Sequence, residues 1–429
     1  MSILLGIAQF MSDFFFSQPA FLIGFIALIG LLVQKKPVQT VISGTIKTIV
    51  GFLIMSQGVN LIVGAVDGLG PLMSRVFGIQ AVQVTMASAA YVQSYGSTFT
   101  LIMTFGFLIN VLLARFTKFK YIYLTGHMMF WTVMVFCAVI VELFPGVSQT
   151  TLLVIGSIVM GLYWTLSPAL TAKYSQDVTG SDEFVLGHNV SIGAWVAGFL
   201  APFLGKPEDS AEELKMPSSL AFVKDITVVT GLVMTLIYVL FVIVAGGGYV
   251  EAEISGGQNF ILYALTKGFG FSLALTILLA GVRMMIAEIV PAFRGISMRI
   301  VPDAKPALDC PVFFNYAPTS LMLGFLITFA TSMVLALVLG LTGIAGIVPP
   351  ITPAFFEGGT MAIFANARGG KKAVVIVSIL AGIWIVAGQA ICMPLFTNTV
   401  ADMYTWWNSP DIITYPPILY GILRIFTGS

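Results

Sequence analysis

The residues best suited to do chemistry in this chain are two histidines, each directly preceded by a glycine. They are His127, in the segment Leu-Thr-Gly-His, and His188, in the segment Gly-His-Asn. The remaining sequence is strongly apolar, being 58% hydrophobic and 9% charged, with a mean hydropathy of +0.99. Ionisable side chains at membrane depth are costly and are usually functional. We therefore predict that both imidazoles line a site for a small polar solute.

Three further side chains extend this candidate site. Trp131 follows His127 by four residues, so both lie on one helix face, where imidazole and indole N–H can hydrogen-bond a polyol or enediol. Asn189 adds an amide next to His188. Asp309 is a carboxylate in an apolar stretch and needs donors, either solute hydroxyls or backbone N–H groups. Each residue alone could merely tie helices together, but in a chain with so few polar groups the set favours a solute-binding site.

Other kinds of chemistry find little support in the sequence. Three cysteines and two histidines show no spacing typical of a metal centre. Cys310, beside Asp309, could line a site, but core filling is favoured. The Gly-Gly-Lys-Lys segment at 369–372 lacks the spacing of a phosphate-binding loop, and there is no Gly-x-Ser-x-Gly motif. We predict no catalytic residue, metal or cofactor, and no nucleic-acid partner.

Long apolar segments must position these side chains. A helix that crosses a membrane needs about 20 apolar residues. Nine to eleven segments that could form such a crossing occur along the chain. The runs are continuous rather than alternating, which indicates helices and not a β-barrel. The fold class predicted is an all-α polytopic membrane protein with about 11 transmembrane helices. The spans are read at 20–33, 41–66, 99–114, 121–141, 151–166, 226–245, 260–281, 321–341, 347–365, 373–395 and 412–426.

Two sets of similar segments indicate an internal repeat. Residues 57–63 resemble 280–286, and 94–98 resemble 315–319, at a nearly constant offset. Chance recurrence in an apolar chain is the alternative, but a constant offset favours duplication. Inverted repeats are common in secondary transporters. We predict a single membrane domain over 1–429, with a first half at 20–205, a cytoplasmic loop at 206–225 and a second half at 226–429. Tyr95 and Tyr316 should then be equivalent.

Four segments are too polar for lipid and too apolar for solvent, and are predicted to form re-entrant hairpins that line the site. Non-helical backbone survives at membrane depth only where protein or water satisfies it. Ordinary extramembrane loops are the alternative. These segments form two pairs, 81–97 with 302–318 and 167–193 with 349–370.

Two other segments carry structural signals. The charged loop at 206–225 contains Ser210 and Glu213, spaced as a capping box that opens a short helix. It is expected to be a solvated connector, with contact to a partner as the alternative. Residues 283–299 are amphipathic, and Pro291 should kink the helix or restart it. This segment either lies along the membrane surface and transmits movement between the halves, or is an interfacial helix with no moving role.

Several ordered motifs carry a resemblance to a known family. Those motifs are Gly-Thr-Ile-Lys-Thr-Ile-Val-Gly-Phe at 44–52, Leu-Thr-Gly-His-Met-Met-Phe at 124–130, Ala-Pro-Phe-Leu-Gly-Lys at 201–206, Gly-Val-Arg-Met at 281–284 with Ala-Glu at 287–288, and Phe-Ala-Asn at 364–366. With them, nearly the whole chain resembles the membrane-embedded enzyme IIC of the bacterial phosphotransferase system, in the L-ascorbate branch of the ascorbate–galactitol group.

The resemblance implies a homodimer in the bacterial inner membrane. In each protomer a transport core would move against a scaffold domain, elevator-fashion. Uptake would be coupled to phosphorylation of the solute by a separate enzyme IIB, which carries a phosphocysteine and is charged by enzyme IIA. On this interpretation the chain is a permease subunit, and the partners perform the phosphoryl transfer.

The resemblance also implies that His127, His188, Asp309 and, less surely, Thr85 hold the solute. Two residues depart from the ascorbate-type pattern, because Trp131 and Asn189 stand where that pattern has glutamine. L-ascorbate is the favoured solute. A galactitol- or pentitol-like polyol, and ion-coupled symport without phosphorylation, are the alternatives.

Overall fold

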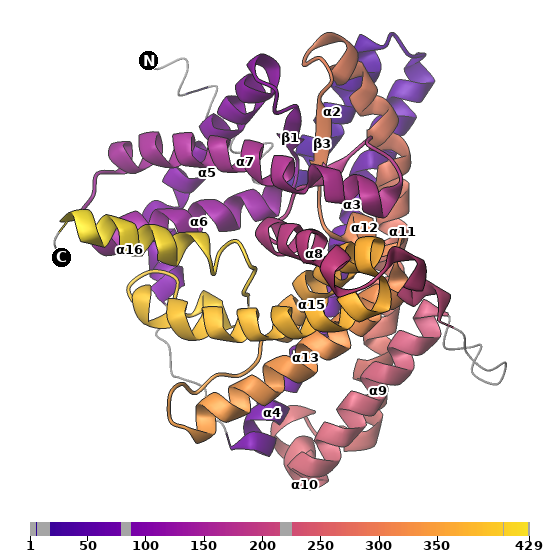
Figure 1. Cartoon of the computed structure of the whole chain (residues 1–429), viewed down its shortest axis with the longest axis vertical. Helices are drawn as coiled ribbons and strands as arrows, with labels where there is room; N and C mark the ends of the chain where they lie inside the picture. Colours follow the sequence, from indigo (N-terminus) through magenta and orange to yellow (C-terminus); the bar gives the residue numbers. More distant parts are fainter. Residues whose placement is uncertain (1–5, 7–17, 79–86, 215–224, 406, 428–429) are drawn as a thin grey trace.

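The computed structural model describes residues 6, 18–78, 87–214, 225–405 and 407–427, which form a bundle of long helices (Figure 1). Eight of the helices within these ranges are long and apolar enough to cross a membrane. Two shorter apolar helices, Pro19–Val33 and Ser191–Leu204, accompany them. The all-α, multi-span fold class is confirmed, whereas the expected number of crossings stays a prediction.

The helices follow the apolar segments of the sequence closely. In chain order the longer ones are α2 (Pro19–Val33), α3 (Val38–Val66), α4 (Leu69–Phe77), α5 (Ala87–Phe116), α6 (Gly126–Leu143), α7 (Gln149–Thr179), α8 (Ser191–Leu204), α9 (Ile226–Ala245), α11 (Phe260–Arg299), α13 (Pro318–Leu341), α15 (Gly359–Leu395) and α16 (Tyr415–Thr427). The short elements include α10 (Gly247–Tyr249), α12 (Pro311–Phe314), α14 (Ile351–Pro353), the 3₁₀ turns η2 (Pro207–Asp209), η3 (Ala211–Glu213) and η7 (Met403–Thr405), and the π-turns η5 (Val250–Ile254) and η6 (Ala354–Gly358).

One set of helices, called here the α3–α11 group, consists of α2, α3, α4, α9 and α11, which pack mainly on one another. Its central contact is the crossing of α3 and α11, where glycines allow the two backbones to touch. A Cβ at Gly51 would lie 2.6 Å from the backbone N of Met285, and one at Gly281 would overlap the backbone N of Met55. Small residues at a crossing are the usual way for membrane helices to gain close packing.

The remaining helices form a second set, called here the sheet group, which surrounds three short strands. Within it α5 packs on α7, and α15 packs on both α8 and α13. Figure 1 shows α5, α6, α7 and α16 on one side of the molecule, with α9 and α11 on the other. Contacts between the two groups are sparse compared with those inside each of them.

The three strands form a small parallel sheet. Their order is β1 (Tyr121–Tyr123), β3 (Lys305–Leu308) and β2 (Val185–Leu186), so the central strand comes from the second half of the chain. The sequence reasoning expected hairpins but no sheet. Strands of two to four residues leave no alternating pattern to detect. They pair because irregular backbone inside the bundle must satisfy its hydrogen bonds.

The expected separation of the segments 347–365 and 373–395 appears as a kink. Within α15 (Gly359–Leu395) two helices meet at Gly370, whose backbone departs from helical geometry (φ 62°, ψ −161°). Glycine is required at this position because of its positive φ and because the carbonyls of Lys206 and Asp209 lie against it.

Pro291 does not restart the helix as a separate surface element, because α11 runs through it from Phe260 to Arg299. The Gln34 amide donates to the carbonyls of Pro291 and Ala292, at 2.9 and 3.2 Å. These bonds join the end of α2 to α11 next to the proline.

The charged loop is also more ordered than expected. Over residues 206–214 it docks on the sheet group instead of forming a plain solvated connector. The Glu212 carboxylate accepts hydrogen bonds from the backbone N of Thr319 and Ser320, at 3.0 and 2.7 Å, and so caps the start of α13. The expected capping box is not formed as predicted. Ser210 instead caps the 3₁₀ turn η3, where its Oγ accepts from the backbone N of Glu212 and not of Glu213.

Candidate functional site

The candidate site forms at the carboxyl edge of the small sheet. His127 lies four residues after β1, His188 two residues after β2, and Asp309 directly after β3. The ends of parallel strands meet at one edge, which is where α/β sheets usually bind ligands. Because β3 is central, its carboxylate lies between the two imidazoles.

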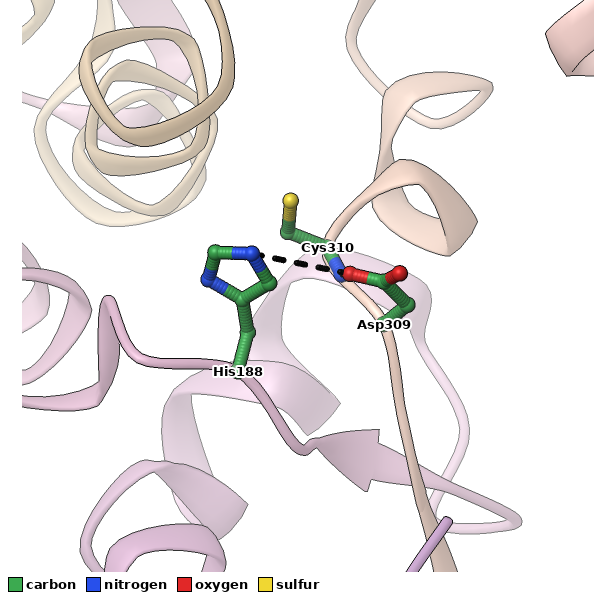
Figure 2. A group of neighbouring side chains, drawn as sticks. All are labelled: His188, Asp309 and Cys310. Carbon is green, nitrogen blue, oxygen red and sulfur yellow. Dashed lines mark hydrogen bonds and ion pairs between the residues drawn. The ribbon is translucent and has the colours of Figure 1, made fainter. Parts of the chain in front are cut away.

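Asp309 faces both histidines at short range. The distance from His127 Nε2 to Asp309 Oδ2 is 3.3 Å, and from His188 Nε2 to Asp309 Oδ1 it is 3.7 Å. The backbone N of Cys310 donates to Asp309 Oδ1 at 2.8 Å, so one of the predicted kinds of donor is present. The side chains of Asp309 and His188 are buried, whereas that of His127 is 35% exposed. Figure 2 shows His188 turned towards the carboxylate.

The glycine before His188 is needed for the close approach of β2 to β3. A Cβ at Gly187 would lie 2.7 Å from the carbonyl carbon and oxygen of Ala307. The backbone N of Gly187 donates to the carbonyl of Leu308 at 2.7 Å, and Thr125 Oγ1 donates to the carbonyl of Gly187 at 2.6 Å. These bonds hold the two histidine-bearing turns against the central strand, so the backbone positions the imidazoles.

The site opens into a cavity of about 470 Å³, a size suited to a small molecule. Residues from both helix groups line it. From the α2 and α3 side these include Gln18, Pro19, Ala20, Phe52, Leu53, Met55, Ser56, Val59, Asn60 and Val63; from the sheet group they include His127, Met128, Trp131, His188, Asp309, Pro311, Thr352, Phe356, Glu357 and Trp407. The cavity therefore lies at the boundary between the two groups.

The structure brings four of the six sequence-predicted residues together, since His127, Trp131, His188 and Asp309 line one cavity. Trp131 also contacts the indole of Trp407, with ring centroids 5.6 Å apart.

Asn189 does not line this cavity. Asn189 is fully buried outside the cavity lining, and its Oδ1 accepts from the hydroxyl of Tyr123 at 3.5 Å. Its backbone carbonyl accepts from the backbone N of Asp411, at 2.9 Å. Thr85 lies outside the described residues.

Glu357 is a cavity residue that the predicted site did not include. It is 1% exposed, lies in the π-turn η6 and lines the same cavity. Single π-turns often mark functional sites. The available signal was a lone carboxylate in the interrupted segment 349–370, but nothing in the sequence showed that it would face the histidines.

The donor atoms of His188, Asp309 and Cys310 lie within 4.8 Å of one another, an arrangement that could hold a metal ion (Figure 2). Sequence spacing did not indicate this group, because the residues come from the ends of two strands. Asp309 Oδ1 already accepts the backbone N–H of Cys310 and faces His188, so the three residues are organised without an ion.

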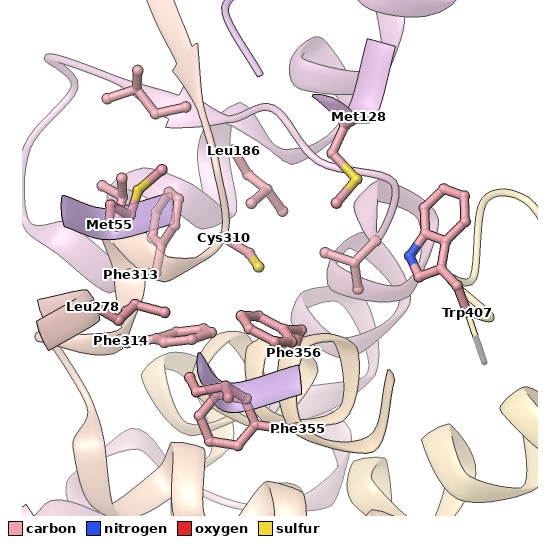
Figure 3. Close-up of a cluster of buried hydrophobic side chains, with 14 of the residues drawn as sticks. Met55, Met128, Leu186, Leu278, Cys310, Phe313, Phe314, Phe355, Phe356 and Trp407 are labelled. Carbon is pink, nitrogen blue, oxygen red and sulfur yellow. The ribbon is translucent and has the colours of Figure 1, made fainter. Parts of the chain in front are cut away.

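An aromatic wall lies behind one side of the cavity and reaches the lining through Phe356. Phe314 meets Phe355 edge to face at 5.7 Å, and Phe355 meets Phe356 at 5.1 Å. Figure 3 shows Phe313, Phe314, Phe355 and Phe356 gathered near Cys310. Such an apolar wall excludes water, which raises the cost of any polar group left without a partner.

An ion pair at the other end of β3 anchors the central strand. Lys305 Nζ donates to Asp182 Oδ2 at 2.6 Å, and this ammonium lowers the pKa of the exposed Asp182 carboxyl. The pair joins β3 to the turn that leads into β2. It lies outside the cavity lining.

Comparisons with known proteins bear on this arrangement. The family described as "PTS system sugar-specific permease component" matches residues 14–411. The "Ascorbate-specific PTS system EIIC component" of Mycoplasma pneumoniae is 28% identical to the chain over 445 aligned positions, which cover 91% of this chain and 67% of that protein. The family match spans every strand and every described cavity residue.

Proposed function

This chain belongs to the sugar-specific permease components of the phosphotransferase system, and from that premise we propose that it takes up L-ascorbate with coupled phosphorylation. A multi-pass permease of this system takes a sugar and works with the enzymes IIA and IIB. The proposal adds the solute, and a place in the cytoplasmic membrane of a bacterium. The name of the Mycoplasma relative supports the choice of solute.

The observation that carries the proposal is the pair of imidazoles that faces one carboxylate at the cavity wall. An enediol lactone presents several hydroxyl groups and a carbonyl within a few bond lengths. A carboxylate accepts hydrogen bonds from hydroxyl groups, and a neutral imidazole donates one and accepts one. His188 Nδ1 is buried and has no hydrogen-bond partner among the described residues, so a solute oxygen that reached it would satisfy it.

We expect His127→Ala and His188→Ala each to weaken L-ascorbate binding about tenfold or more, because each removes up to two hydrogen bonds worth ~1 kcal/mol apiece. Isothermal titration of the purified protein in detergent measures this change. Size-exclusion profiles and thermal melting without solute serve as controls for folding. A well-folded variant with wild-type affinity would remove that histidine from the site.

A polyol similar to galactitol or a pentitol is the second candidate solute. One observation favours it: two carboxylates, Asp309 and Glu357, line the cavity. They suit a neutral polyol better than L-ascorbate, which is an anion at neutral pH. The test is a binding screen of purified protein against L-ascorbate, galactitol and xylitol. The solute that binds most tightly, and that displaces the other two most effectively, identifies the class of transported solute.

Coupling to phosphorylation separates this proposal from ion-coupled symport. Proteoliposomes that contain the chain should accumulate phosphorylated solute only when purified IIA, IIB and a phosphoryl donor are present on the cytoplasmic side. Uptake of unmodified solute driven by an ion gradient alone would support the symporter instead.

We further propose that the sheet group is the transport core and the α3–α11 group the scaffold. The sparse packing between the groups and the position of the cavity at their boundary support this division. Exposed polar links also bridge them: Arg294 of α11 pairs with Glu183, and Arg283 Nε donates to Asn315 Oδ1 at 3.1 Å. Under this proposal α3 and α11 form the homodimer contact, and these links break as the core moves.

Distances between spin labels test the elevator. One label is placed on the exposed face of α3, at Ile46, and the other in the sheet group, on the exposed face of α7 at Ile158. Movement of the core should change this distance between solute-free protein and protein held with solute and phosphorylated IIB. A matched pair within one group, Ile46 with Leu273 of α11, should not change. Two invariant distances would favour a gate around an unmoved site.

A further inference from the structure

Glu357 is held in place by the backbone of a π-turn, by the hydroxyl group of Ser409 and by the indole of Trp407, which also interacts with the carboxyl group. Its Oε1 accepts a hydrogen bond from Ser409 Oγ, in the segment that precedes α16. The turn η6 packs against α13 and leads directly into α15. The carboxyl group is therefore fixed from two sides rather than free to seek a partner elsewhere.

The second oxygen of the same group is unsatisfied. Glu357 Oε2 is buried and has no hydrogen-bond partner among the described residues, although the side chain lines the cavity. Phe356, the preceding residue, belongs to the aromatic wall. A buried acceptor left unpaired costs roughly 1–3 kcal/mol, and more if it is charged. Native proteins carry such a cost mainly at sites with a task.

We propose that Glu357 is a solute-binding residue whose Oε2 accepts a hydrogen bond from a hydroxyl group of the transported solute. This inference rests on the proposed function and deepens it, because it adds a second anchor to the His127–Asp309–His188 cluster. An ionised carboxylate only accepts, so the matching solute group is a donor. The class of solute is polyhydroxylated, with hydroxyl groups that reach both carboxylates of the cavity.

The first arm of the test measures binding. Glu357→Met keeps the length of the side chain and removes both oxygens, whereas Glu357→Gln keeps one oxygen and removes the charge. With whichever solute the wild type binds, we expect affinity to fall about 100-fold in Glu357→Met and about tenfold in Glu357→Gln, because a charge-assisted hydrogen bond is lost. Wild-type affinity in Glu357→Met would overturn the inference.

The second arm needs no solute and separates a binding role from a structural one. Replacing a buried, half-satisfied carboxylate by an apolar side chain of similar volume is often neutral or stabilising. That holds only where no buried donor loses its acceptor, and Glu357→Met leaves the buried Ser409 hydroxyl without one. Glu357→Gln keeps an oxygen for Ser409, so without solute it should melt near the wild-type temperature, while the increase in melting temperature caused by solute becomes smaller. A clear loss of stability of Glu357→Gln without solute would make Glu357 structural and refute the proposal.

Glu253→Gln is the matched control, since this exposed glutamate lies in the other π-turn, η5, outside the cavity lining. It should change neither readout. If the wild type binds neither L-ascorbate nor a polyol, the proposed function fails. The melting arm then still decides the role of Glu357.

Discussion

Replacing Asp309 by asparagine should weaken solute binding about 100-fold, which corresponds to about 2.8 kcal/mol. The carboxylate lies between two imidazoles, 3.3 and 3.7 Å from their Nε2 atoms. It therefore faces both histidines, and it also offers acceptors to the solute. Asparagine keeps an oxygen for the backbone N of Cys310 but turns an NH₂ group towards the Nε2 atom of His127. A neutral imidazole has only one acceptor nitrogen, so a ring that is protonated at Nε2 would meet this donor with another donor.

Isothermal titration with the solute identified in the binding screen measures this effect. Asp182→Asn is the matched control, because this exposed aspartate pairs with Lys305 at the opposite end of the same strand. A surface ion pair contributes about 0–1 kcal/mol, so the control should bind solute normally. If Asp309→Asn binds within threefold of wild type, the carboxylate does not organise the site.

Gly281→Ala should lower the free energy of unfolding by about 3 kcal/mol or more, because over-packing of a close contact is costly. The new methyl group would meet three backbone atoms of α3: the nitrogen of Met55, the carbonyl oxygen of Gly51 and the carbonyl carbon of Ile54. No change of side-chain rotamer relieves a clash with backbone. The two helices must move apart, which loosens the α3–α11 group as a whole.

Thermal melting in detergent, followed by tryptophan fluorescence, measures this loss. Gly270→Ala in the same helix is the control, because a Cβ there has open space within 4 Å. It should be neutral or slightly stabilising, since alanine favours a helix by up to ~1 kcal/mol over glycine. Equal melting temperatures for the two variants would mean that the crossing tolerates separation.

The parts of the site that could be predicted from the sequence were the residues of types that are rare in this chain. In an apolar chain a histidine or aspartate is conspicuous, and His127, His188 and Asp309 do meet. Helix periodicity also placed Trp131 correctly beside His127. Predicting a site residue because it is next to another in the sequence was less successful, since neighbouring side chains in a tight turn point in different directions. Asn189 therefore packs against Tyr123 while His188 faces the cavity.

What sequence could not supply were contacts between segments far apart in the chain. The sheet depends on residues 121–123, 185–186 and 305–308, each too short to show a pattern alone. Glu357 gained its role from the fold of η6 around it. The charged loop looked solvated because its composition is polar, yet Asn366 accepts from the backbone N of Ala211 at 2.8 Å and fixes it.

The order of the strands constrains when the site can assemble as the chain is made. The two outer strands belong to the first half of the chain and do not pair with each other in the finished sheet, where a strand from the second half lies between them. Until residues 305–308 leave the ribosome, both edges keep unpaired backbone groups within the bundle, and the imidazoles lack their carboxylate. In non-local pairing of this kind, the chain loses loop-closure entropy before any contact stabilises the sheet. The helices of the first half can thus insert early, while a competent site appears late and in one step.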